Sequence, residues 1–199
     1  MNRPFIVGLC GPAGCGKSSI ARAYAEAAQR CIATAFAAPL YALAAQLVYG
    51  DATAGERLRD ELTKERPWEA SGPWGAPIPS LIGWTPRRLL QVLGTECVRQ
   101  RIGNNAWVEL ALASAERHGA AGVKAVVFED VRFDHEAAAC DLVVEVNRPG
   151  VDYAADHPSA YRISEDLIHR LLPNIDTVAG AVNYLASMIA EHRTEECAS

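Results

Sequence analysis

The stretch that decides the fold is PFIVGLCGPAGCGKSS, residues 4–19. Its apolar first part, residues 4–10, leads into a glycine and predicts a buried parallel strand. The alanine-rich residues 17–30 that follow predict a helix. Between them, residues 11–18 match the pattern G-x-x-x-x-G-K-[ST] at every position and in the required strand-to-helix context.

This loop has the chemistry of a phosphate site. Glycines let the backbone fold closely around phosphate oxygens, and successive N–H groups at a helix N-terminus attract an anion. Lys17 adds a charge for the β- and γ-phosphates, and the Ser18 hydroxyl can ligate Mg²⁺. A glycine-rich turn without a ligand is the disfavoured alternative. The predicted triphosphate-binding residues are Gly11, Gly14, Cys15, Gly16, Lys17, Ser18 and Ser19. The loop alone does not distinguish a kinase from a GTPase or an ATPase, although the guanine-binding pattern N-K-x-D is absent.

Along the rest of the chain, segments with the pattern of a strand alternate with segments with the pattern of a helix. Further strands are predicted at 31–37, 124–128, 141–146 and 171–175, and helices at 39–49, 86–101, 105–118 and 177–192, with a polar tail expected to fray after His192. Thr85 is a candidate N-cap, and Gly50 ends the helix before it. Strands alternating with helices predict an α/β domain with a mostly parallel sheet.

Composition bounds the possible functions. The chain has 199 residues, which suits one domain over 1–199, and a net charge of −5, which argues against a non-specific nucleic-acid face. It has no apolar run of membrane-spanning length, and the N-terminal apolar stretch is too short for a signal peptide, so a cytoplasmic protein is expected. The six cysteines match no zinc pattern and are expected to be free thiols.

Residues 51–85 differ from their surroundings. Charged residues dominate at first, and SGPWGAPIPSLIGW, residues 71–84, is rich in Gly, Pro and Trp. The segment is expected to be an insertion, either a surface loop or a flap that covers a substrate. If Trp68, Trp74 and Trp84 are exposed, they mark either a dimer face or the cover of a cleft, so monomer and homodimer both remain open.

Two further segments carry arginines. On the predicted helix in TPRRLLQVLGTECVRQR, residues 85–101, the 3.6-residue period places Arg87, Gln91, Gly94 and Thr95 on a polar side. The opposite, core side has Leu89, Leu90, Leu93 and Cys97. A glycine in mid-helix, Gly94, suggests that another group approaches the backbone closely. An amphipathic helix with a solvated face is an equal alternative.

The run FEDVRFDHE, residues 128–136, follows a buried-type strand, and ligands of open α/β sheets lie beyond the strand ends. There Asp130 could hold a metal-bound water or orient the acceptor, and Arg132 could clamp a phosphate. Glu136 could accept hydrogen bonds from a sugar or orient an arginine. Arg148, in NRPG, is a candidate lid arginine. A solvated acidic turn and a plain surface arginine are the alternatives.

Together these motifs resemble the phage-type deoxynucleoside monophosphate kinases, a branch of the P-loop nucleotide kinases. The resemblance runs through GPAGCGKSS, FAAPLYALA, TPRRLLQVLGTECVRQRIGNNAWV, EDVRFDHEAA, VNRPG and LLPNIDT. The block LLQVLGTE and its following Trp is the most specific part.

The resemblance implies particular roles. The acceptor monophosphate would be bound by residues from several segments: Leu40, Tyr41, Arg66 (or Lys64), Arg87, Gly94, Thr95, Trp107 and Glu136. Lys17, Asp130 and Arg132 would be catalytic, Ser18 would hold Mg²⁺, and Arg148 would belong to a short lid over 148–165.

The sequence thus predicts a three-layer α/β P-loop kinase fold, with a parallel sheet of about five strands between helices. The expected activity is transfer of the ATP γ-phosphoryl group to a deoxynucleoside monophosphate that sits between Arg87 and Asp130. A dephospho-coenzyme A kinase and a non-catalytic ATP-binding sensor are the alternatives. The expected location is the cytoplasm, that of the host if a phage encodes the protein.

Overall fold

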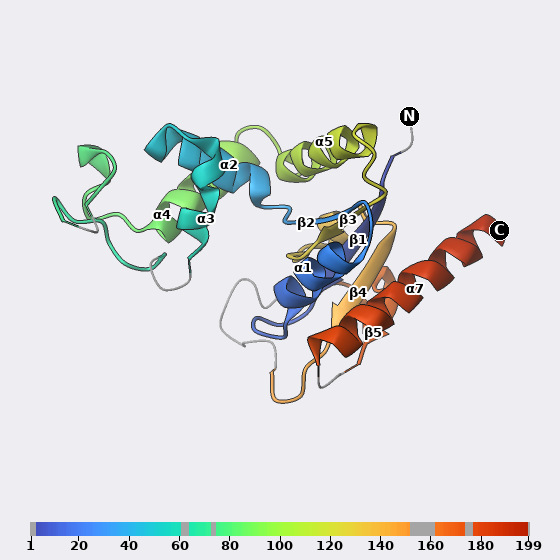
Figure 1. The fold of residues 1–199 in the computed structure, drawn as a ribbon. Helices are drawn as coiled ribbons and strands as arrows, with labels where there is room; N and C mark the ends of the chain where they lie inside the picture. The colour runs from blue at the N-terminus through green and yellow to red at the C-terminus, as the bar shows by residue number, and fades with distance from the viewer. Residues whose placement is uncertain (1–2, 61–63, 73–74, 152–161, 174–176, 199) are drawn as a thin grey trace. The chain divides into compact units, whose positions relative to one another are not determined.

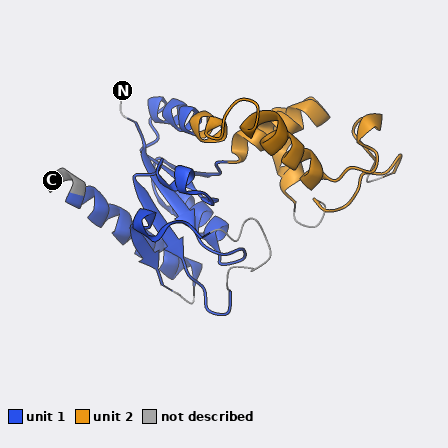
Figure 2. Cartoon of the chain, turned by 180° about the vertical axis from the view of Figure 1, so that it is seen from behind, with its two compact units in different colours: residues 1–36, 112–199 blue, residues 37–111 orange. Residues whose placement is uncertain are grey.

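The computed structural model describes residues 3–60, 64–72, 75–151, 162–173 and 177–198, with side chains up to residue 195 in the last stretch. The chain forms two compact units: unit 1 comprises residues 1–36 and 112–199, and unit 2 comprises residues 37–111 (Figure 2). The expected insertion at 51–85 lies within unit 2.

Unit 1 is built on a parallel sheet. Its described strands are β1 (Phe5–Cys10), β2 (Cys31–Thr34), β3 (Ala125–Phe128), β4 (Leu142–Val146) and β5 (Arg170–Leu172). They lie in the order β2-β3-β1-β4-β5, with every pair parallel. In the central register Val7 pairs with Val127 on one side and with Leu142 on the other. The predicted α/β fold with a five-stranded parallel sheet is confirmed.

One face of this sheet is covered by α1 (Lys17–Ala27) and α7 (Val178–Ala198), as Figure 1 shows. Val7 and Leu9 of β1 are fully buried there, in one cluster with Tyr24 of α1 and Leu185 of α7. Gly8 points to the opposite face, where a Cβ atom in its place would lie 2.7 Å from the Cys140 sulfur and 2.8 Å from Val131. Apolar side chains therefore pack on both faces, as expected for strands that read as continuous apolar runs.

Unit 1 also has two short elements between its strands. α6 (Asp134–Ala137) comes after β3, and the 3₁₀ turn η5 (Glu165–Leu167) comes before β5. The last helix was predicted to end at His192, and this bound is wrong, because α7 continues through Ala198. None of the described helices is both long enough and apolar enough to cross a bilayer.

Unit 2 is mainly helical. Its elements are α2 (Ala38–Tyr49), η1 (Ala52–Gly55), α3 (Glu56–Arg59), η2 (Pro79–Leu81), α4 (Pro86–Gln91) and η3 (Val92–Arg99), and the boundary with unit 1 falls inside α5 (Ala106–Ala120). They enclose a small core of their own that includes Leu58, Trp68, Leu81 and Leu89. Gly50 ends α2 with a left-handed backbone, φ 69°, as the sequence predicted.

The Trp-rich segment is fixed to this core. Trp68 is 8% exposed, so the condition under which it would mark a dimer face or the cover of a cleft is not met. Its backbone N–H donates to the carbonyl of Trp84 over 2.8 Å, and its carbonyl accepts from Gly83 over 2.9 Å. These bonds close the segment into a loop around a buried indole. Trp74 lies outside the described residues.

The helix predicted over 86–101 changes its winding. Thr85 caps α4 through a 3.1 Å bond from the Arg88 N–H to its hydroxyl, as predicted. After Gln91 the chain winds as the π-helix η3. A π-helix has more residues per turn than an α-helix, so the 3.6-residue period no longer assigns faces. Hence Cys97, expected in the core, is exposed, and Gly94, expected on the polar side, is buried.

Candidate functional site

The loop between β1 and α1 in unit 1 has the backbone of a phosphate cradle. Gly11, Gly14 and Gly16 all take positive φ values, 130°, 79° and 104°, where residues with a side chain are strained. A Cβ atom at Gly11 would lie 2.5 Å from the carbonyl oxygen of Val146, at the end of β4. The glycines of the motif are therefore needed for the shape of the loop itself.

Several donors of this loop remain available. Within the described residues, the backbone N–H groups of Gly14 and Gly16 donate to no protein acceptor. The first N–H groups of α1 also lack intrahelical partners, because a helix leaves its first four unpaired. The Lys17 ammonium lies over the loop and donates to the carbonyls of Gly11, 2.8 Å away, and Pro12, 2.7 Å away. Ser18 and Ser19 are exposed at the start of α1.

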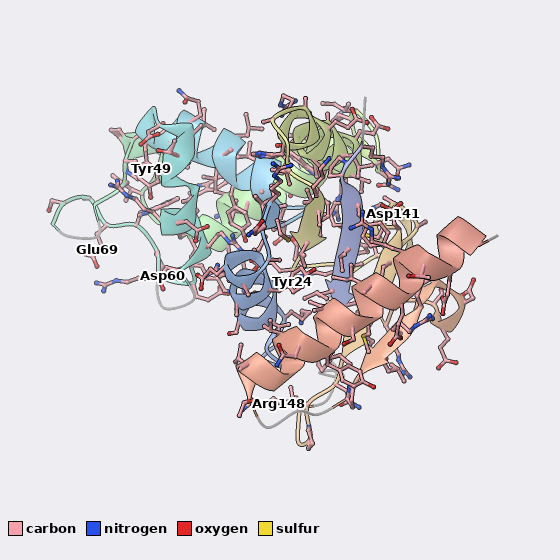
Figure 3. The ribbon with its side chains drawn as sticks, turned by 45° about the vertical axis from the view of Figure 1, so that its right-hand side comes forward. Tyr24, Tyr49, Asp60, Glu69, Asp141 and Arg148 are labelled. Atoms are coloured by element: carbon pink, nitrogen blue, oxygen red, sulfur yellow. The ribbon has the colours of Figure 1, made fainter. Side chains whose placement is uncertain are left out.

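A second cation contacts the same loop. Arg148, which follows β4 and is labelled in Figure 3, donates from Nη1 to the carbonyl of Gly14 over 3.3 Å. It was predicted as a lid arginine, and the structure brings it to the P-loop. Residues 152–161 of the predicted lid lie outside the described residues.

Acidic side chains stand at the ends of the strands beside the P-loop. Asp130 follows β3, and its Oδ1 accepts a 2.6 Å bond from the backbone N–H of Phe36. Sequence reasoning missed its neighbour Glu129, which is 3% exposed and lies 3.8 Å from the Arg22 guanidinium of α1. It also missed Glu145 at the end of β4, which is buried and lies 3.4 Å from Arg162. The signal available in the sequence was an acid at the end of an apolar strand.

The Cys10 thiol, at the end of β1, has a raised pKa. Burial, and next the nearby charge of Glu145, raise the pKa of Cys10 to about 12. Cys10 is therefore a protonated core thiol at neutral pH rather than a nucleophile.

The turn after β3 carries Arg132 and Glu136. Glu136 is 5% exposed, and its Oε2 accepts from the backbone N–H of Arg132 over 2.8 Å and of Phe133 over 3.3 Å. The Arg132 side chain is exposed. The structure thus places the Glu136 carboxylate inside the turn, against the backbone of Arg132. Of its two predicted roles, binding a sugar and orienting an arginine, this position favours the second.

The predicted acceptor arginines lie in unit 2, and each has a protein partner. Arg87 pairs through Nε with Glu65, and Arg66 pairs with Glu69 at 2.8 Å. Next to Arg87, the Arg88 guanidinium stacks over the Trp84 ring, 4.2 Å from its centroid. Arg87 and Arg66 are 41% and 44% exposed, so a phosphate in solution can reach them in competition with these carboxylates.

The group that approaches Gly94 is Leu40. A Cβ atom at Gly94 would lie 2.9 Å from the Leu40 Cδ2. Trp107 is 4% exposed and donates from its indole N–H to the Gly94 carbonyl over 3.0 Å. Thr95 beside it is exposed. Four predicted acceptor residues thus lie together in unit 2, and three of them pack against one another.

Tyr41 also lies in unit 2, on α2. The Arg59 guanidinium lies over its ring, 5.4 Å from the centroid. An aromatic ring paired with a guanidinium is a common surface for stacking a base.

The donor chemistry is that of hard oxygen ligands. The Ser18 hydroxyl, with carboxylates at the ends of β3 and β4, suits Mg²⁺, which prefers oxygen ligands and keeps waters and substrate phosphates among them. Among the described residues, no group of three or more His, Cys, Asp and Glu side chains is placed to hold a metal.

One known protein family matches part of the chain. Residues 80–157 match the family model of deoxynucleotide monophosphate kinase. The predicted family resemblance is confirmed. The matched segment includes Arg87, Trp107, Asp130 and Arg148, while the P-loop lies outside it, so the two observations support a nucleotide kinase separately. No curated protein matches the chain.

Proposed function

We propose that this deoxynucleotide monophosphate kinase relative transfers the γ-phosphoryl group of ATP to a deoxynucleoside monophosphate, forming ADP and the diphosphate. The observation that carries the proposal is the loop Gly11–Ser18, with spare backbone donors and Lys17, in a chain whose residues 80–157 match this family. The acceptor is a small molecule, and the protein acts in the cytoplasm as a monomer or homodimer, without nucleic acid or membrane.

Unit 1 supplies the triphosphate site. The Gly14 and Gly16 amides and the N-terminus of α1 bind phosphate oxygens, and Lys17 exchanges its loop carbonyls for the β- and γ-phosphates. Arg148, already in contact with Gly14, adds a second positive charge. Ser18 would hold Mg²⁺, with Glu129 or Asp130 as the carboxylates nearby, and the ion would supply positive charge that neutralises the phosphates.

The acceptor is bound by guanidinium groups. In unit 2, Arg87 and Arg66 exchange Glu65 and Glu69 for the monophosphate, because a dianion competes well with an exposed carboxylate. In unit 1, Asp130 accepts from or orients the acceptor, and Arg132 stabilises charge on the transferred group. No covalent enzyme intermediate is needed, since positioning and charge stabilisation account for phosphoryl transfer.

A coupled assay of ADP release tests the proposal. The acceptor panel contains the four deoxynucleoside monophosphates, their ribose forms and dephospho-coenzyme A, with ATP and Mg²⁺ in excess. At least one deoxynucleoside monophosphate is expected to stimulate ADP release by orders of magnitude over ATP alone. If dephospho-coenzyme A alone stimulates ADP release, the protein is a dephospho-coenzyme A kinase instead. ATP binding without any acceptor-dependent ADP release would make it a sensor.

A further inference from the structure

Arg132 stands out in unit 1 as an exposed guanidinium on a fixed backbone. Within the described residues its guanidinium makes no hydrogen bond or ion pair. Other arginines near strand ends are engaged, such as Arg162 with Glu145 and Arg22 with Glu129. A cation kept out of internal pairs remains available to an anionic ligand.

The backbone that carries Arg132 is fixed from both sides. Val131, immediately before it, is 3% exposed and donates its N–H to the Leu9 carbonyl over 3.2 Å. Asp130 accepts from Phe36 over 2.6 Å. On the far side, the Asp134 carboxylate accepts two bonds from Ser164, 2.6 Å from the hydroxyl and 3.0 Å from the N–H. Little backbone freedom remains for the turn.

The remaining support under Arg132 is a buried carboxylate. Glu136 is 5% exposed, and a buried carboxylate is costly unless it accepts hydrogen bonds. Its Oε2 accepts hydrogen bonds from the Arg132 and Phe133 N–H groups. These two bonds offset the free-energy cost of burying the carboxylate, and they hold both amides in place. This places the Glu136 carboxylate against the backbone of Arg132 rather than in the solvent where a sugar would bind.

We propose that Glu136 is a positioning residue that acts through Arg132 and does not bind the acceptor sugar, an inference that rests on the proposed function. The carboxylate fixes the direction in which the turn presents the guanidinium. Displacement of a positioned group by about 1 Å lowers the rate by up to about 100-fold, so loss of this support is expected to reduce turnover.

A double-mutant cycle tests this assignment in the full-length protein. The variants are Arg132→Ala, Glu136→Ala and the double variant, with kcat and KM for the best deoxynucleoside monophosphate measured at saturating ATP. Arg132→Ala is expected to lower kcat about 100-fold and Glu136→Ala about 10-fold. The double variant is expected to match Arg132→Ala within about threefold, because residues that act as a unit do not add.

The conservative variant separates positioning from charge. Glu136→Gln keeps an amide oxygen that accepts from the same two N–H groups, so it is expected to retain kcat within about threefold of the wild type. A loss as large as that of Glu136→Ala would show that the charge itself is used, and would overturn the proposal. A loss of kcat in the double variant equal to the product of the two single losses would overturn the proposal as well.

Two controls keep instability apart from positioning. Val182→Ala truncates a buried side chain of α7, among the residues packed on the opposite face of the sheet, and is expected to lower Tm without lowering kcat at 20 °C. The Kd of a non-hydrolysable ATP analogue is expected to be unchanged in every variant. If wild-type protein shows no acceptor-dependent ADP release, the proposed function fails. If it does, and Arg132→Ala is fully active, the role of Arg132 and this inference fail.

Discussion

The two units prepare for anions in opposite ways. In unit 1 the phosphate loop offers backbone donors that no protein acceptor uses within the described chain, and glycines with positive φ angles give the loop its shape. In unit 2 the corresponding cations are already satisfied, Arg87 by Glu65, Arg66 by Glu69 and Arg88 by the Trp84 ring. Apart from Lys17, which must release two loop carbonyls, the first site is ready for an anion, whereas binding at the second is an exchange of partners.

The strongest test of the preformed site is removal of the Lys17 ammonium. Lys17→Ala is expected to lower kcat/KM for phosphoryl transfer about 10³-fold, because the variant loses the cation proposed to contact the β- and γ-phosphates. Thermal unfolding is expected to change little, since the loop is held by its own backbone. Lys124→Ala, at an exposed lysine of unit 1, is the matched control. A fully active Lys17→Ala protein would contradict the role of the loop.

The exchange in unit 2 is tested by removing either partner. Arg87→Ala is expected to raise the acceptor KM about 10- to 100-fold, because a charged hydrogen bond contributes roughly 1.5–3 kcal/mol. Glu65→Gln is expected to have the opposite sign and to lower that KM about two- to fivefold, since an exposed ion pair is worth at most about 1 kcal/mol.

Steady-state kinetics with varied acceptor measures both effects, and Arg101→Ala, an exposed arginine of the same unit, is the control. An unchanged acceptor KM in Arg87→Ala would remove Arg87 from the site. A raised KM in Glu65→Gln would show that Glu65 supports the arginine rather than competing for it.

A smaller effect, on stability, is expected from the bond between Trp107 and Gly94 of η3. Trp107→Phe removes the indole N–H that donates to Gly94 and is expected to lower the free energy of unfolding by about 1–2 kcal/mol more than Trp68→Phe does. Trp68 is similarly buried but its indole makes no such bond within the described residues, so the pair differs mainly in that bond. Urea unfolding at equilibrium measures the difference. Equal losses of unfolding free energy in the two variants would show that the bond does not contribute to stability.

The smallest effect concerns thiols and leaves activity unchanged. Among the described cysteines Cys97 is the exposed one. In a Cys197→Ser protein it is expected to react first with a disulfide reagent at pH 8, in a phase that Cys97→Ser abolishes. Burial raises the pKa of Cys10 to about 12, so it stays protonated and reacts only after unfolding. Fast labelling of Cys10 in the native protein would show that β1 is open.

The sequence predicted best where structure is local. The strand, loop and helix of residues 4–27 and the caps at Thr85 and Gly50 depend on residues close in the chain, and each formed as expected. The winding of η3 was not predictable, because it accompanies the packing of Gly94 against Leu40 and Trp107. Glu129 was missed beside Asp130 because two adjacent acids look alike until the sheet buries one of them.

The burial of Trp68 was missed for a similar reason. Its partners, including Leu58 and Leu89, come from separate elements of unit 2, and no periodicity in 51–85 indicates them. Site residues, Glu136 included, were predicted by type and by position after strands. The carboxylate Glu65, which pairs with Arg87, became visible only through that contact.

The strand order has a consequence for synthesis on the ribosome. The strand that precedes the phosphate loop, β1, pairs with β3 and β4, whose residues lie more than a hundred positions later in the chain. Such distant pairing delays folding, because chain closure must come first. A nascent chain that stops before residue 125 contains the whole phosphate motif and still lacks both strands that pair with β1. We therefore expect nucleotide binding to report that β1 has gained its neighbours in the sheet, not only that the motif has been made.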